Sequence, residues 1–200
     1  MSALPTNGAT GATTAESPAK LGMVIFLATD AMGFGGLLLA YAVLRVRAAA
    51  WPDPAVRLDR TIAALLTFVL LASGGTMSAA LTAARRDRVG VARRWLAATL
   101  GLGATFVLGQ AAEFRALSSE RHVGLTTDHA ASLGYVIGGF HGMHVVAGLV
   151  ALASVALRRS SSTERWRGGV EVAALYWQFV DLVWIVIFTA LYLLPVASHG

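Results

Sequence analysis

The chain has 200 residues, 56% of them hydrophobic and 14% charged, and its mean hydropathy is +0.64. This excludes an ordinary soluble domain, which is about 45–50% apolar and about 25% charged, and it indicates an integral membrane domain. The net charge of +5 does not predict a nucleic-acid partner, because the arginines cluster between apolar segments, where they set topology and contact lipid headgroups. The absence of cysteine excludes disulfides, thiolate metal sites and covalent c-type haem.

Residues 1–19 are rich in Ser, Thr, Ala, Gly and Pro, and they lack the basic start and early apolar core of a cleavable signal peptide. We expect a disordered tail over residues 1–19 and a membrane domain over residues 20–197. The first helix of that domain then directs the chain to the membrane.

Five apolar segments follow in chain order, and each reaches the roughly 20 residues that a membrane-spanning helix needs. They cover about 21–44, 61–83, 95–114, 132–157 and 172–195. All prolines lie outside these segments or at their ends, where they do not break a helix in lipid. The sequence therefore predicts an all-α bundle of five transmembrane helices. Lys and Arg are more frequent in the segments that an N-in, C-out topology places inside the cell, so we expect that orientation.

Four ionisable side chains are expected near the middle of these helices. Asp30 and Asp181 lie at matching depths in segments that start from the inside, and His141 and His144 lie at a similar depth on one face of the fourth segment. A charge at mid-membrane costs about 2.5–3.5 kcal/mol and normally has a partner or a task. We expect the four side chains to face the bundle interior with at least one Asp–His contact, which supports proton uptake or holds helices together.

Gln110 and Glu113 are a second polar pair, three residues apart and nearer the outer surface. We expect Glu113 to reach the headgroup region or to pair with Arg115 or a neighbouring helix end.

The two histidines of the fourth segment are also the kind of pair that can ligate zinc or iron. No acid stands three residues before either of them, as it does in di-iron bundles. We therefore expect hydrogen-bonded packing histidines, with no metal ligand and no catalytic residue. Few further polar residues line a path from face to face, although a stand-alone transporter built around these side chains stays an alternative.

The last apolar segment contains the aromatic run Tyr176–Trp184, which includes Trp177 and Gln178. This run resembles the last-helix signature of the subunit III family of haem–copper oxidases. The run from Gly139 to Gly148 is similar to its Gly-Phe-His-Gly-x-His-Val motif. The remaining matches are Leu21–Asp30, Leu71–Gly74 and Gly109–Phe114, and all five occur in order over residues 21–195.

Two positions depart from the family pattern. The family usually has Glu where this chain has Asp30, and His where it has Gln178. Asp is one methylene shorter than Glu, and Gln does not titrate as His does. A divergent oxidase subunit, or the similar accessory subunit of a nitric oxide reductase or another respiratory complex, would fit these departures. The length resembles the five-helix bacterial form.

The resemblance implies a non-catalytic accessory subunit of an aerobic terminal oxidase in the bacterial cytoplasmic membrane. In that family the haems and copper belong to partner subunits, so no cofactor is expected in this chain. The resemblance further implies packing on subunit I, with subunit II in the same complex, bound phospholipid, and support of proton uptake and turnover stability.

Overall fold

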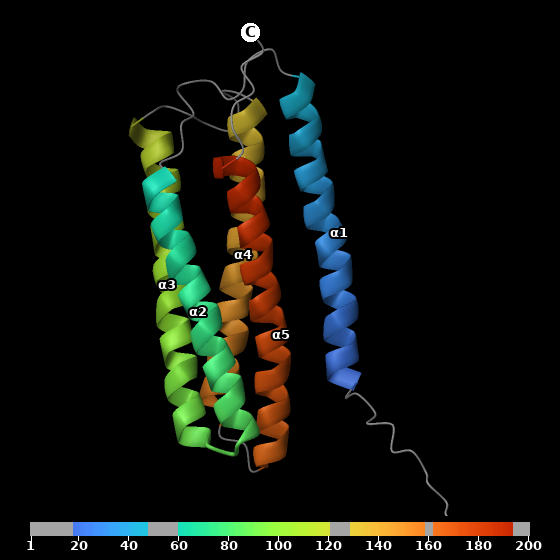
Figure 1. The fold of residues 1–200 in the computed structure, drawn as a ribbon, viewed down its shortest axis with the longest axis vertical. Coiled ribbons are helices and arrows are strands. Elements are labelled where there is room, and N and C mark those ends of the chain that lie inside the picture. Colours follow the sequence, from blue (N-terminus) through green and yellow to red (C-terminus); the bar gives the residue numbers. More distant parts are fainter. Residues whose placement is uncertain (1–17, 48–59, 121–128, 159–161, 194–200) are drawn as a thin grey trace, which may run out of the picture.

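The computed structural model describes residues 18–47, 60–120, 129–158 and 162–193, and within these ranges it contains helices and no strand (Figure 1). The long helices are α1 (Pro18–Arg47), α2 (Arg60–Arg85), α3 (Val89–Glu120), α4 (His129–Leu157) and α5 (Thr163–Phe188). A short π-helical turn, η2 (Thr189–Leu193), continues α5. Each of these five helices is long and apolar enough to cross a membrane, so the predicted all-α class with five spanning helices is confirmed.

Several helices extend beyond the apolar segments that predicted them. Helix α3 begins at Val89 rather than 95, and α5 begins at Thr163 rather than 172. A helix does not end where hydrophobicity ends, because polar residues in the headgroup region continue the backbone hydrogen bonds. At the start of α5 the Ser162 side chain accepts a hydrogen bond from the Arg165 backbone N–H at 3.4 Å, which caps the helix. The expected tail covered residues 1–19, but residues 18 and 19 belong to α1. Residues 1–17 and the predicted ends at 195 and 197 lie outside the described residues.

Helices α2 and α3 form a hairpin with a three-residue turn. Asp87 adopts a left-handed backbone conformation with a φ of 56°, and the Arg88 backbone N–H donates to the Ala83 carbonyl at 3.0 Å. This arrangement satisfies the last carbonyls of α2, which otherwise have no partner at a helix end.

Helix α5 is the most enclosed element, and α1 is the least. Figure 1 shows α2, α3, α4 and α5 as one bundle with α1 along its edge beside α5, and α1 contacts α4 and α5. Helix α5 buries residues along its whole length, whereas α1 buries only Phe34 and Tyr41. The core therefore lies around α5, and the outer side of α1 exposes apolar side chains, as expected of a helix that faces lipid.

Candidate functional site

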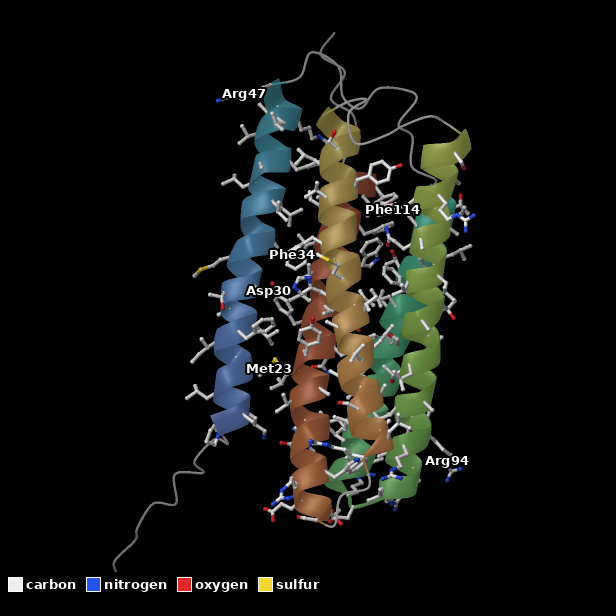
Figure 2. All side chains as sticks on the ribbon, turned by 180° about the vertical axis from the view of Figure 1, so that it is seen from behind. Met23, Asp30, Phe34, Arg47, Arg94 and Phe114 are labelled. Atoms are coloured by element: carbon white, nitrogen blue, oxygen red, sulfur yellow. The ribbon has the colours of Figure 1, made fainter. Side chains whose placement is uncertain are left out.

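The structure brings Asp30 of α1 together with His144 of α4. The Asp30 Oδ1 atom lies 3.1 Å from the His144 Nε2 atom, and the side chains are only 10% and 15% exposed. Figure 2 shows Asp30 and Phe34 partway along α1, on the side that faces the other helices. The Phe34 ring lies against the rings of Phe140 and His144, with centroid distances of 4.9 and 5.2 Å, and so closes one side of the pair.

The contacts of this pair place a proton on one nitrogen of the His144 ring. The His144 Nδ1 atom is 2.7 Å from the Phe140 carbonyl oxygen, which can only accept, so Nδ1 carries a proton and donates. The His144 Nε2 and Asp30 Oδ1 atoms, 3.1 Å apart, are within hydrogen-bonding distance, and a hydrogen bond here needs a proton on one of the two atoms.

His141 occupies a different environment, although it is three residues from His144. It is fully buried in an aromatic surround from three helices: its ring stacks on Trp184 of α5 at 5.1 Å and meets the edges of Phe34 and Phe106 at 6.2 and 6.0 Å. Neither ring nitrogen has a hydrogen-bond partner among the described residues. The expectation of hydrogen-bonded histidines is therefore wrong for His141, whose described ring contacts are all with other aromatic rings.

Asp181 lies in the contact between α5 and α2 rather than beside Asp30. It is 8% exposed, and its carboxylate packs so closely on Gly74 that a Cβ atom at this glycine would overlap it. In the described part of the chain, Asp181 forms no hydrogen bond or ion pair with either histidine. Asp181 shares a face of α5 with Trp177 and Trp184, and that face is turned toward α2.

The two signature residues of α5 have separate partners on α2. The Trp177 Nε1–H donates to the Ser73 hydroxyl at 3.0 Å, and its ring lies against Gly103 of α3 and Gly148 of α4. Gln178 is exposed and donates from Nε2 to the Ser78 hydroxyl at 3.2 Å. Trp177 thus joins four helices at one point, while Gln178 lies on the surface of the α2–α5 contact.

Gln110 and Glu113 are more enclosed than the sequence indicated. They are 6% and 7% exposed, so Glu113 does not reach out to the headgroups. Its carboxyl lies beside Tyr192 of η2.

Sequence reasoning missed the hydroxyl and charged partners of these residues. Ser73 of α2 accepts from Trp177, and Thr67 of α2 accepts from Trp184 Nε1 at 2.9 Å; these are two of the three buried tryptophans of α5. A hydroxyl in an apolar helix usually bonds its own backbone, so these positions gave no separate signal.

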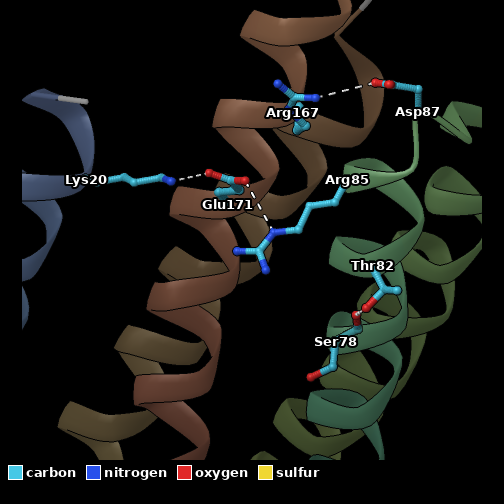
Figure 3. A network of polar contacts seen from close by, with 7 residues as sticks. All are labelled: Lys20, Ser78, Thr82, Arg85, Asp87, Arg167 and Glu171. Atoms are coloured by element: carbon cyan, nitrogen blue, oxygen red, sulfur yellow. Dashed lines mark hydrogen bonds and ion pairs between the residues drawn. The ribbon is translucent and has the colours of Figure 1, made fainter. Parts of the chain in front are cut away.

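Charged side chains also pair at the end of the bundle that carries the α2–α3 turn (Figure 3). Glu171 of α5 pairs with Lys20 of α1, and it lies 3.4 Å from Arg85 Nε of α2. Arg167 lies 3.6 Å from Asp87. Some of the cations that the sequence assigned to lipid headgroups therefore link helices α1, α5 and α2.

The fold and the buried ionisable side chains define the class of protein. Five helices that can cross a membrane, with ionisable side chains buried at mid-helix, make this a multi-pass membrane protein. Among the described residues there is no group of three or more His, Cys, Asp or Glu side chains that could hold a metal ion.

Comparison with known proteins identifies the family. Residues 6–196 match the model of the cytochrome c oxidase subunit III family, and the chain belongs to that family. Cytochrome c oxidase subunit 3 of Thermostichus vulcanus is 34% identical over 87% of this chain and 86% of its own length. The probable cytochrome c oxidase subunit 3 of Mycobacterium tuberculosis is 36% identical over 86% of each chain. The Synechocystis protein of the same name is 37% identical over 86% of this chain and 74% of its own. This family forms part of the cytochrome c oxidase complex and is a subunit without redox centres of its own.

Proposed function

We propose that this chain is a non-catalytic accessory subunit of an aerobic terminal oxidase in the bacterial cytoplasmic membrane. It packs on subunit I, shares the complex with subunit II, and leaves the haems and copper to these partners. The relatives described above are named as cytochrome c oxidase subunits, which favours an oxidase over a nitric oxide reductase as the parent complex.

The observation that carries a functional role beyond assembly is the Asp30–His144 pair. It places two ionisable side chains in contact at mid-helix, between α4 and the mainly exposed helix α1. An ionisable group in this position is costly and marks proton relays and related functions. We propose that the pair supports proton uptake by the partner subunit and sustains turnover, and that phospholipid binds along the exposed apolar side of α1.

Affinity purification of the tagged full chain in mild detergent tests the parent complex. We expect oxidase subunits I and II to co-purify and the preparation to show a haem spectrum. Co-purification with nitric oxide reductase subunits would assign the other respiratory parent, and a stable chain with no partner and a transport activity would contradict the proposal.

Substitutions of Asp30 separate proton support from packing. Asp30→Asn keeps a group that can donate to His144 Nε2 but removes the titratable carboxyl, whereas Asp30→Ala also leaves the histidine nitrogen unbonded. We expect both variants to assemble into the oxidase and to lose activity faster than the wild type during sustained turnover. If Asp30→Asn keeps its activity during sustained turnover as long as the wild type does, and only Asp30→Ala loses activity faster, the pair has a packing role alone.

A further inference from the structure

The surface that α2 and α5 share has a polar side chain that the bundle leaves exposed. Gln178 lies near the middle of the span Thr163–Leu193, and within the described residues its hydrogen-bonding partner is the Ser78 hydroxyl alone. An amide carries two N–H donors and a carbonyl acceptor. The other N–H and the carbonyl of this exposed amide therefore have no hydrogen-bond partner among the described residues.

Exposed hydroxyl groups elsewhere in the spans, unlike the Gln178 amide, have hydrogen-bond partners within their own helix. Thr29, Thr105 and Ser154 each donate to a carbonyl of their own helix, at 2.7 to 2.9 Å. Their hydrogen-bonding needs are met locally, so these faces are compatible with lipid. Hydrocarbon offers Gln178 no hydrogen bond, and burying an unbonded amide in it is unfavourable.

The surroundings of Gln178 suit the close approach of another helix. Helix α2 presents a row of exposed residues spaced three and four apart, namely Leu71, Gly75, Ser78 and Thr82. Helix α5 presents a parallel row of Leu175, Gln178 and Leu182. The small residues of α2 leave space for the backbone of a neighbouring helix, since a Cβ atom at Gly75 would meet nothing within 4 Å. Small residues with polar side chains between them are the usual contact surface of membrane helices.

A second polar group lies at the base of the same contact. Asp181, one turn from Gln178, is more than nine-tenths buried against Gly74, and its Oδ1 atom has no hydrogen-bond partner among the described residues. A buried carboxylate oxygen needs a donor. Within the described part of the chain, the α2–α5 contact therefore has two unsatisfied polar groups: the buried Oδ1 atom of Asp181 and the exposed amide of Gln178.

We propose that this α2–α5 face, formed by Leu71, Gly75, Ser78, Thr82, Leu175, Gln178 and Leu182, is the docking site for a transmembrane helix of the catalytic partner subunit. That helix presents a hydrogen-bonding side chain to Gln178 and small residues to the row on α2. The inference rests on the proposed function and adds which face of the subunit meets the partner.

Two glycines provide a matched test of the docking face in the intact complex. Gly75 on α2 and Gly101 on α3 are both exposed at mid-helix, and an added Cβ atom meets nothing within 4 Å at either site. A side chain added at either site therefore leaves the backbone into open space. We expect Gly75→Trp to insert into the membrane at the wild-type level but to be retained severalfold less in the purified oxidase, whereas Gly101→Trp is retained like the wild type. Equal retention of the two variants, or loss of Gly101→Trp alone, overturns the proposal.

Photo-cross-linking identifies the occupant of the face. A benzophenone amino acid in place of Gln178 is expected to cross-link to the catalytic subunit, and the same group in place of Leu108, which is 70% exposed on α3, is not. A cross-link from Gln178 to lipid only or to a second copy of this chain would overturn the proposed occupant. If the chain co-purifies with oxidase subunits but cross-links from Leu108, the docking face is wrong while the proposed function stands. If no oxidase subunit co-purifies, the proposed function itself fails.

Discussion

At the scale of single residues, Trp177 shows how one side chain organises several helices. It is completely buried, its N–H bonds Ser73 of α2, and its ring lies on glycines of α3 and α4. The bulky ring fits because Gly103 and Gly148 have no side chain at the point of contact. A residue that forms part of a family motif thus has a structural role that its position in the motif did not indicate.

Trp177→Phe is expected to destabilise the bundle by about 2 kcal/mol, because it removes a buried hydrogen bond and part of a buried ring. Trp95→Phe is the control, since Trp95 is 42% exposed on α3. Thermal unfolding of the two purified variants in the same detergent, followed by the loss of monodisperse protein, measures the difference. Equal unfolding temperatures would contradict the role of Trp177 as the central contact.

The Asp30–His144 pair depends on both its residue types and the packing of the helices. Asp30 and His144 come from separate motifs, and they meet because α1 and α4 lie side by side at matching depth. His141 has the same residue type as His144, yet it has only aromatic neighbours in ring contact. Chemical type alone therefore does not assign a role to either histidine.

At the scale of elements, the close contacts of α3 with α4 and α5 depend on glycine at particular positions within the α3 helix. A Cβ atom at Gly103 would lie 2.6 to 2.9 Å from Trp177 and Leu149 side-chain atoms, whereas one at Gly101 would meet nothing within 4 Å. The two glycines are two residues apart and so face in different directions.

We predict that Gly103→Ala destabilises the bundle by about 1–3 kcal/mol through overpacking. Gly101→Ala is expected to be neutral or to stabilise by up to about 1 kcal/mol, because alanine is the better helix former. Unfolding of both variants in detergent measures the contrast. Similar effects at the two positions would show that helix propensity rather than packing decides the outcome.

Helix α1 is held to the bundle by polar contacts near both ends and at its middle. Lys20 pairs with Glu171, Asp30 contacts His144, and Arg45 Nη1 donates to the Ala190 carbonyl at 3.3 Å. Because α1 buries few side chains, these contacts carry much of its attachment.

Glu171→Gln is expected to loosen the first turns of α1, because Lys20 and Arg85 lose their shared carboxylate. The effect on overall stability is expected to stay below about 1 kcal/mol, since the cations are partly exposed to solvent. Hydrogen–deuterium exchange should become faster in residues 18–24 and remain unchanged in α3. Glu164→Gln, on the exposed first turn of α5, is the control; matching exchange in both variants would contradict the attachment.

At the scale of the whole molecule, the orientation of the bundle in the membrane follows from charge distribution and stays a prediction. The arginines of the α2–α3 turn and of the segment before α5 are expected in the cytoplasm. The native sequence has no cysteine, so a single introduced thiol reports on one site without background.

Arg86→Cys in the α2–α3 turn should react with a membrane-impermeant maleimide only after the cells are permeabilised. Ser119→Cys at the other end of α3 should react in intact cells. The reverse pattern would establish an N-out orientation, and it would place the Lys20–Glu171–Arg85 ion pairs on the outer side.

The sequence by itself determined the membrane class, the five spanning helices and the family motifs. These depend on composition, on apolar length and on local residue order, all of which are properties of the chain before it packs. The same reasoning placed the helix ends only approximately, because the helical hydrogen bonds of α3 and α5 run on into polar sequence.

Only the tertiary structure decided which buried side chains meet. Depth in the membrane follows from counting residues, but the rotation of each helix about its axis depends on the shapes that pack against it. Asp30 and Asp181 have matching depths, yet one faces His144 and the other faces Gly74. Glu113 is buried beside Tyr192 of η2, which no local pattern in α3 indicates. Contacts of this kind join residues far apart in sequence, so they exist only once the five helices have packed.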